Sequence, residues 1–437
     1  MKNLKPELKF TVRSIVIIFM FLLSNACSKI PTTSMEIFYE KIPGSKNHGP
    51  NGTWWGYNQS KIIRYGNSVY MYVVENENID TNPNPNATNP SKIAIYCKEG
   101  NGSWQKGASF NASRPGNILV DSDGVVHLIV FEPTYIKPDE NGSFGKLKHY
   151  WFPNSPSGNI TSYQQETIVD NDGATQGETV NIRVGAAIGS NDMIVVSFGI
   201  NDSHKAYYKE KNGTVWTMET AGNNLGDNYY YPYVLVTGSG IGIMAIQDGY
   251  VGDGLPNTYQ KIYYFEKNNG TWSQHSIIDL QSHPLASTRP QLVETSDFYQ
   301  DANNRLNVIY STRLDPADQY LNTFTQATKN GTSWQNQSIQ ISDKNTGWIK
   351  IIEINGDFYY LCSAWDKLYL KKGTSGNYVK LNVPKVDGMY IYVTSPRGGT
   401  SSSESYIDIL ILCGYNDSYP NADNYYLRIE KSEFTKI

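Results

Sequence analysis

Apolar residues fall in short runs that come in pairs along most of the chain, with a polar turn between the two runs of each pair. Seven pairs occupy 61–74, 117–131, 184–198, 233–246, 291–310, 349–364 and 390–412. Their residues are mostly β-branched or aromatic, and Gly-Asn, Asp-Gly and Asn-Gly dipeptides stand in the turns, as in β-hairpins. The pattern therefore predicts seven apolar hairpins and no helix longer than one or two turns.

A more amphipathic pair of strands follows each apolar hairpin, and an Asn-Gly turn that ends in an aromatic residue marks most of these pairs. The tryptophans of these turns are Trp104, Trp216, Trp272 and Trp334, which lie 112, 56 and 62 residues apart. Four strands per repeat of this length predict an all-β chain folded as one β-propeller with seven four-stranded antiparallel blades. We expect the strand near Tyr425 to close the ring by pairing with the early strand near Ile37.

The Asn-Gly-(Ser/Thr)-x-Trp turn after an aromatic strand resembles a degenerate Asp-box, the turn of BNR-repeat proteins. Asparagine stands here where the usual motif has its first acidic residue. That family includes sialidases and seven-bladed propellers of bacteria that degrade polysaccharides. The resemblance implies that the turns are structural and lie on the face away from the active site, with the four tryptophans packed between outer strands.

The first 34 residues look like a targeting segment. Four basic residues up to Arg13 precede the short apolar run 14–23, and small residues then lead to Cys27. This is the layout of a secretory signal peptide, and the run is shorter than the roughly 20 residues that span a bilayer. Because Cys27 follows the small residues directly, the segment resembles a bacterial lipobox, although an ordinary signal peptide with an incidental cysteine has the same layout.

The predicted organisation is a signal peptide at 1–26, a lipidated tether at 27–34 and a propeller at 35–437. Lipid on Cys27 would anchor an exported protein to a membrane, at the bacterial outer membrane or cell surface. The remaining cysteines, Cys97, Cys362 and Cys413, lie in apolar strand-like runs. We expect them to be buried and unbridged.

Composition narrows the function classes. The 437 residues carry a net charge of −4 and include 33 tyrosines and nine tryptophans. A strongly basic nucleic-acid binder is excluded by this charge. No phosphate-binding loop, dinucleotide fingerprint or metal-ligand motif stands in a usable context, so we expect no cofactor, no metal and a monomeric chain.

Propeller geometry brings the starts of the inner strands and the ends of the second strands to one face. The residues expected there as substrate contacts are Arg114, Arg183, Arg289, Trp55 and Trp348. Arg114 and Arg289 both precede proline at equivalent positions, and the Arg-Pro pair resembles the arginine-bearing opening strand of sialidases. Because a guanidinium binds a carboxylate through two parallel hydrogen bonds, these arginines favour an acidic ligand.

Three residues are candidates for proton transfer. Glu132 ends a second strand, His149 begins a third strand in the same blade, and Tyr231 opens an inner strand. Carboxylates, imidazoles and phenols can all move protons at a sheltered site. Each also has an ordinary structural role as turn, core or packing residue.

The sequence thus predicts an exported carbohydrate-active enzyme, either a polysaccharide lyase or a glycoside hydrolase, that acts on an acidic glycan in a central funnel. The alternative is a non-catalytic glycan-binding surface lipoprotein. The expected face residues differ from blade to blade, which favours one asymmetric catalytic site over the repeated sites of a lectin.

Overall fold

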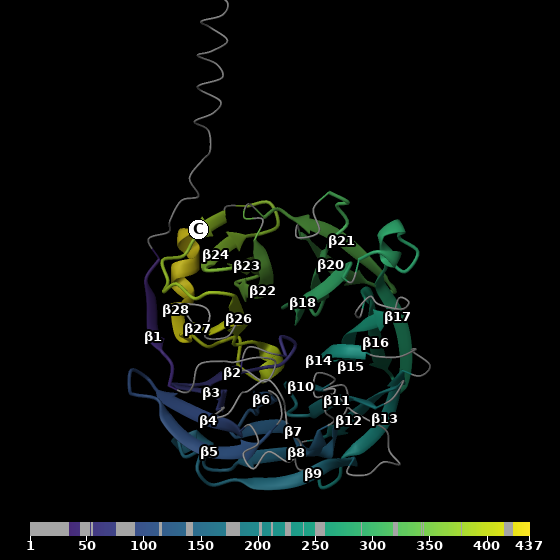
Figure 1. The fold of residues 1–437 in the computed structure, drawn as a ribbon. Helices are drawn as coiled ribbons and strands as arrows, with labels where there is room; N and C mark the ends of the chain where they lie inside the picture. The colour runs from purple at the N-terminus through teal and green to yellow at the C-terminus, as the bar shows by residue number, and fades with distance from the viewer. Residues whose placement is uncertain are drawn as a thin grey trace, which may run out of the picture.

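Seven four-stranded antiparallel sheets form a ring in the computed structural model (Figure 1). The structure describes residues 35–43, 53, 56–75, 92–112, 116–136, 143–171, 184–200, 203–210, 213–222, 229–238, 240–249, 258–289, 291–317, 322–341, 343, 345–376, 378–414 and 423–437. The predicted fold, a seven-bladed β-propeller, is therefore confirmed.

In blades 1 to 6 the four strands follow chain order from the central channel outward. Blade 1 contains β2 (Ile62–Tyr65), β3 (Ser68–Glu75), β4 (Lys92–Glu99) and β5 (Gln105–Asn111). Blade 2 contains β6 (Asn117–Val120), β7 (Val126–Ile136), β8 (Ser143–Phe152) and β9 (Gln164–Asn171). Blade 3 contains β10 (Val184–Ile188), β11 (Ile194–Ile200), β12 (Ser203–Lys209) and β13 (Thr217–Gly222).

The next three blades repeat this order. Blade 4 contains β14 (Tyr229–Thr237), β15 (Gly240–Gly249), β16 (Thr258–Asn268) and β17 (Thr271–Asp279). Blade 5 contains β18 (Val293–Gln300), β19 (Leu306–Thr312), β20 (Thr323–Asn330) and β21 (Ser333–Ile339). Blade 6 contains β22 (Thr346–Ile354), β23 (Asp357–Ala364), β24 (Lys367–Lys372) and β25 (Tyr378–Lys380).

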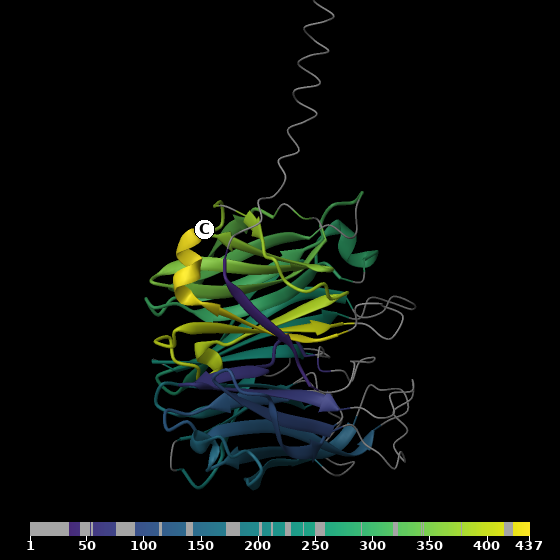
Figure 2. The same cartoon turned by 90° about the vertical axis from the view of Figure 1, so that its left-hand side faces the viewer.

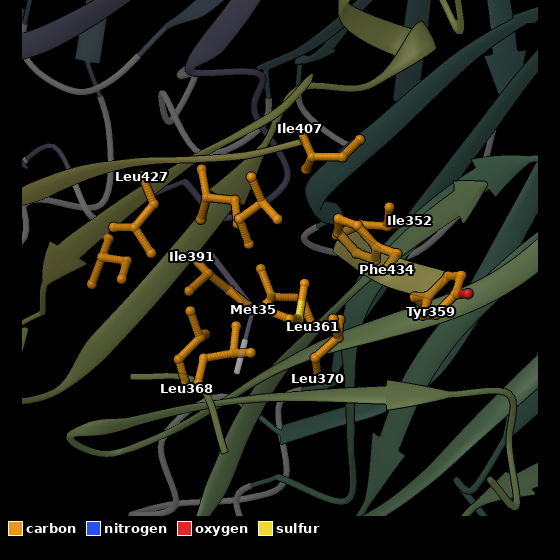
Figure 3. Packing of buried hydrophobic residues seen from close by; sticks show 14 of the residues in the cluster. Met35, Ile352, Tyr359, Leu361, Leu368, Leu370, Ile391, Ile407, Leu427 and Phe434 are labelled. Carbon is orange, nitrogen blue, oxygen red and sulfur yellow. The ribbon is translucent and has the colours of Figure 1, made fainter. Parts of the chain in front are cut away.

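Blade 7 joins the two ends of the propeller chain. Its strands are β26 (Met389–Val393), β27 (Tyr406–Cys413), β28 (Tyr425–Glu430) and, on the outer edge, β1 (Ile37–Lys41). The register pairs Ile37 with Ile429 and Lys41 with Tyr425, so the predicted ring closure is confirmed (Figure 2). Met35 and Phe434 pack in the hydrophobic cluster between blades 6 and 7 (Figure 3).

Helices in the described ranges are short 3-10 turns. They are η1 (Ser155–Ser157), η3 (Pro284–Ser287), η4 (Pro396–Gly398) and η5 (Lys431–Lys436). Within these ranges, no helix has the length and apolar character needed to cross a membrane. Cys97, Cys362 and Cys413 are buried thiols that form no disulfide, as expected.

The tryptophans of the Asn-Gly turns join neighbouring blades, which confirms their packing role. The indoles of Trp104, Trp216 and Trp334 each stand edge-on to a ring of the preceding blade, and the indole nitrogen of Trp272 donates to Glu219 of the preceding blade. A lysine just before each turn forms an ion pair with a glutamate of that preceding blade, at 2.7–2.9 Å in Lys98–Glu40, Lys209–Glu166, Lys267–Glu219 and Lys329–Glu266. We call this recurring arrangement the Lys–Glu–Trp contact.

Two segments fill the centre of the channel. The segment 56–61 crosses it before β2, and the Asn58 side chain donates to the carbonyls of Val184 and Pro232. η4 enters from the β26–β27 connection, and Arg397 donates to the Asn58 carbonyl at 2.7 Å. Gly399, with φ of +92°, lies so close to Val120 that an added Cβ would stand 1.8 Å from its carbonyl oxygen. We call the two segments together the central plug.

Candidate functional site

Four aromatic rings cross the channel at the end where the inner strands begin, which we call the mouth. Tyr231 comes from the start of β14, Trp348 from β22 and Tyr390 from β26, while Tyr57 belongs to the plug. The Tyr57 ring centroid lies 4.2 Å from Tyr231 and 4.4 Å from Trp348, and Trp348 lies 5.2 Å from Tyr390. The structure thus brings together two predicted site residues, Tyr231 and Trp348. We call the four rings the aromatic arc.

Backbone strain is present on the same face. Tyr231 has φ of +53° and Trp365 has φ of +51°, in the left-handed region that bulky residues rarely occupy. Trp365 stands in the β23–β24 turn with 42% of its surface exposed, and its carbonyl accepts from the Met389 amide beside Tyr390. Strained backbone tends to occur where a side chain must be held in a fixed direction, so both residues are candidates for ligand contact.

A polar cluster from blade 5 lies next to this aromatic group. The Arg313 guanidinium donates to Glu294 at 3.2 Å, to Gln291 at 3.0 Å and to Asn322 at 2.8 Å. Burial raises the pKa of Glu294, and the charge of Arg313 offsets part of that rise. The charge of Glu294 also helps to raise the pKa of Tyr57, after the larger effect of burial, which places this carboxylate close to the arc.

Arg289 precedes β18 and holds the blade 5 loop. Its guanidinium donates to the carbonyl oxygens of Arg313 and Pro316, both at 3.0 Å. These two bonds leave the side chain beside the backbone of Arg313, so the two arginines approach the mouth from the same blade. The expected position of Arg289, just before an inner strand, is therefore what the structure has, whereas its role toward a ligand stays a prediction.

Buried cations lie beneath the arc. The Lys350 amine donates to the carbonyl oxygens of Ser296 at 2.6 Å and Tyr57 at 3.3 Å, and burial lowers its pKa to about 8. Arg397 lies over the Tyr233 ring, 5.0 Å from its centroid, and burial lowers its pKa too. The carboxylate of Asp297 acts on both cations, but it makes no hydrogen bond or ion pair with either in the described part of the chain. The floor of the mouth therefore holds two buried cations near one carboxylate.

His149 lies between blades 2 and 3, in a Lys–Glu–Trp contact. Its Nδ1 donates to Glu166 at 2.8 Å, its Nε2 lies 2.9 Å from His127 Nδ1, and its ring stands edge-on to Trp216. Burial lowers the pKa of His149 to about 4. These contacts give His149 a packing role, and no described contact links it to Tyr231. Its catalytic role stays a prediction.

Glu132 lies in β7 and accepts a hydrogen bond from Tyr150, which packs on Phe110 of blade 1. The structure therefore places Glu132 and His149 on different sides of blade 2, and joins neither of them to the arc. Four other predicted residues, Arg114, Arg183, Trp55 and the lipidation candidate Cys27, lie outside the described residues. The predicted opposition of Arg114 and Arg289 across the axis is untested.

Several residues of the mouth were not among the predicted site residues. Glu294 lies within β18 and Lys350 within β22, where strand pattern alone gives no sign of a site. Tyr57 and Arg397 come from segments that look like connections, and they reach the centre only through contacts far apart in sequence. Arg313 ends a second strand, which was a usable signal because such ends meet at this face.

Comparison with known proteins places the fold. No protein-family model matches the chain, and no curated protein matches it in sequence. A solved structure described as a polysaccharide lyase of a new family, PL25 ulvan lyase, aligns with 12% identity and a TM-score of 0.57, over 90% of this chain and 96% of that one. The same kind of lyase bound to -[GlcA(1-4)Rha3S]- aligns with 11% identity, a TM-score of 0.56 and the same coverage. Similarity at this level shows a shared fold, and the resemblance to BNR-repeat proteins stays a prediction.

Proposed function

We propose that the protein is a polysaccharide lyase that acts on an acidic, uronate-containing glycan at the mouth of the propeller. The observation that carries the proposal is the single asymmetric cluster in which the aromatic arc adjoins the Arg313–Glu294 pair. Among the residues that the structure describes, blades 4, 5, 6 and 7 and the plug supply it. A lectin propeller would repeat its binding residues around the ring, whereas an enzyme needs one site.

The cation layer beneath the arc supports an acidic substrate. Lys350 and Arg397 are desolvated and form no ion pair among the described residues, and the nearby charge of Asp297 offsets part of their field. A glycan carboxylate above them would gain attraction without displacing a protein partner. Arg289 and Arg313 would hold that carboxylate through charge-assisted hydrogen bonds, each worth roughly 1.5–3 kcal/mol. Arg114 and Arg183 would add to this grip from blades 2 and 3.

The chemistry of the proposed step is β-elimination. The Tyr231 phenolate would accept the proton on C5 of the uronate, and the electron pair would form the C4–C5 double bond as the bond from C4 to the glycosidic oxygen breaks. The departing oxygen would then take the proton from the Tyr231 phenol. Neutralising the carboxylate makes the C5 proton more acidic. Trp348, Trp365 and Trp55 would hold the flanking sugars by stacking.

The comparisons support this reading of the fold. Two solved structures with the same architecture are described as a polysaccharide lyase, and one of them holds a glucuronate-containing fragment. A hydrolase would instead need two carboxylates on either side of the scissile bond. His149 and Glu132 are the other candidates for proton transfer, and no described contact joins either of them to the cluster.

The test is a set of purified uronate-containing polysaccharides incubated with the protein, followed by ultraviolet absorbance of unsaturated uronate and by a reducing-end assay. A rise in both signals supports the lyase, and its loss in Tyr231→Phe assigns the proton transfer. Reducing ends without the ultraviolet signal would make the protein a hydrolase. Saturable binding without either signal would make it a glycan-binding protein.

The proposal extends to export. The basic stretch, apolar run and Cys27 at the start of the chain support a lipoprotein of the outer membrane or cell surface. Metabolic labelling with a fatty acid in a bacterial host should modify the wild type and leave Cys27→Ser unlabelled. Equal labelling of both would contradict lipid attachment at Cys27.

A further inference from the structure

A groove lies on the face opposite the mouth, where the inner strands end. A cavity of about 850 Å³ surrounds the channel axis, and a second cavity of about 470 Å³ lies between blades 4 and 5. Both are lined by Gly238, Gln300 and Asn304, so they adjoin. Together they form one groove from the axis toward the outer strands, which we call the lower groove.

Three side-chain amides line this groove, those of Asn268, Gln300 and Asn304. None of them forms a hydrogen bond with any residue that the structure describes, whereas buried amides nearby are fully engaged. Gln326, for example, donates to Asn307 at 2.8 Å, and Asn307 donates to Arg305. Each amide of the groove therefore offers both a donor and an acceptor to a ligand.

In the part of the lower groove between blades 4 and 5, the charged groups are already paired within the protein. Lys329 lies 2.8 Å from Glu266, which also accepts from the Tyr264 hydroxyl at 3.1 Å. Arg305 lies 2.8 Å from Asp301. A charged ligand would have to displace these pairs, whereas an uncharged ligand rich in hydroxyl groups could use the amides directly.

The central part of the groove is lined by the carboxylates of Asp121, Asp192 and Glu404 and by Arg397 of the plug, so carboxylates outnumber cations there. Asp121 accepts from the amides of Asp123 and Val125, and Asp192 accepts from the amide and hydroxyl of Ser122. Asp121 also lies 3.5 Å from His127 Nε2, and the charges of the two carboxylates would repel a polyanion. Tyr65 borders the same cavity with 36% of its surface exposed, and its ring rests on Gly124, where φ is +82° and an added Cβ would stand 2.4 Å away. An exposed aromatic ring beside free hydrogen-bonding groups suits a sugar.

We propose that the lower groove is a second, non-catalytic site that binds an uncharged oligosaccharide segment. The amides of Asn268, Gln300 and Asn304 bind its hydroxyl groups, and Tyr65 packs on a sugar ring near the axis. The proposal does not depend on the lyase chemistry of the mouth, because the two sites use opposite ends of the inner strands. The protein would thereby hold a neutral glycan on one face while the other face meets an acidic one.

The experiment is calorimetric titration of the whole protein with neutral linear hexasaccharides of the cello, xylo, manno and laminari series, and with a uronate oligosaccharide. At least one neutral series should bind saturably. The double variant Asn268→Ala/Gln300→Ala should weaken that binding about tenfold or more, since two hydrogen-bonding groups are lost. Hydrogen exchange of the β18–β19 turn should slow when the sugar is bound.

The matched control is Gln335→Ala/Asn336→Ala, which removes the same two amide types from the exposed strand β21 of blade 5. It should bind the neutral sugar as the wild type does. Neither double variant should change binding of the uronate oligosaccharide, which separates this site from the mouth. The proposal is overturned if no neutral series binds, if the groove and control variants bind alike, or if the groove instead takes the uronate oligosaccharide or an extended peptide.

Discussion

His149 meets Trp216 of the next blade edge-on, with ring centroids 5.6 Å apart and ring planes at 86°. Tyr264 meets Trp334 in the same way, at 5.4 Å and 86°, and Tyr426 meets Trp104 at 5.3 Å and 89°. Tyr264 donates to Glu266 as His149 donates to Glu166. The histidine of blade 2 thus fills the place that a tyrosine fills in blades 4 and 7.

This equivalence predicts a pH dependence of stability. Burial lowers the pKa of His149 to about 4, whereas an unfolded histidine takes up a proton near about 6.5. The unfolded state therefore binds the extra proton first, and the fold loses stability as pH falls from about 6.5 to 4, by an amount on the order of 3 kcal/mol. His149→Tyr should abolish this loss, as measured by urea unfolding at pH 7.5 and 5.

The carboxylate partner contributes at lower pH. Burial alone would raise the pKa of Glu166, but hydrogen bonds from His149 and Lys209 outweigh burial and lower this pKa to about 2. Its stabilising effect is present above the unfolded value and is lost as pH falls toward 2, so it remains in His149→Tyr at pH 5. The control is His275→Tyr on β17, which should keep the acid sensitivity of the wild type. If His149→Tyr instead keeps that sensitivity while folding normally, another group carries it.

Two tryptophans should separate stability from binding. Trp334→Ala removes a ring packed between blades 4 and 5, and should lower the free energy of unfolding by about 2–3 kcal/mol without changing affinity for an acidic glycan. Trp365→Ala removes an exposed ring at the mouth. It should lower the free energy of unfolding by less than about 1 kcal/mol and should weaken binding of the glycan. Denaturant titration and calorimetry of both variants check the pair. Equal destabilisation by the two would contradict the assignment of Trp365 to ligand contact.

Lys350 gives a second pH signature, which has the same origin in burial but lies at higher pH. Its pKa in the fold is about 8, below the ordinary lysine value of about 10.4, so the folded protein releases this proton first as pH rises. The wild type should therefore gain stability between about pH 8 and 10. Lys350→Met should lack this gain and should bind an acidic glycan more weakly at pH 7. Unchanged affinity would remove the cation layer from the binding argument.

Arg289→Ala should reduce turnover of an acidic glycan by at least tenfold through loss of a carboxylate contact. Because Arg289 also donates to two carbonyl oxygens of the blade 5 loop, we expect a small fall in melting temperature as well. Arg305→Ala, at the lower end of the same blade, is the matched control and should keep full turnover. If Arg289→Ala keeps normal turnover, Arg289 only holds the blade 5 loop and does not contact the substrate.

The blades could be predicted from the sequence because their signals are local. Hairpin turns and the alternation of apolar residues need only neighbouring positions, and the Asn-Gly-x-Trp turns repeat at a regular spacing. The pairing of β1 with β28 was expected because strand-like runs stand at both ends of the repeats, near Ile37 and Tyr425. Tyr231 and Trp348 were found for the same reason, since both stand at strand starts.

The interior of the mouth could not be predicted, because its contacts join segments far apart in the chain. Arg397 reaches Asn58 across 339 positions, and Lys350 reaches Tyr57 across 293. Neither η4 nor segment 56–61 has a hydrophobic pattern that distinguishes it from a surface loop. His149 shows the opposite limit: its position in a strand was visible, but the edge-on contact with Trp216 depends on how two blades pack.

The two halves of the central plug come from either side of the seam where β1 meets β28. Segment 56–61 lies between β1 and β2 in the chain, and η4 belongs to the blade that β1 completes. β1 can take its place in blade 7 only when β28 is present, so both the ring and the plug depend on this pairing. Pairing between segments so far apart in the chain is slow. Formation of the plug and closure of the ring then become one late step of folding. A chain that stops before that step would lack the plug residues beneath its mouth.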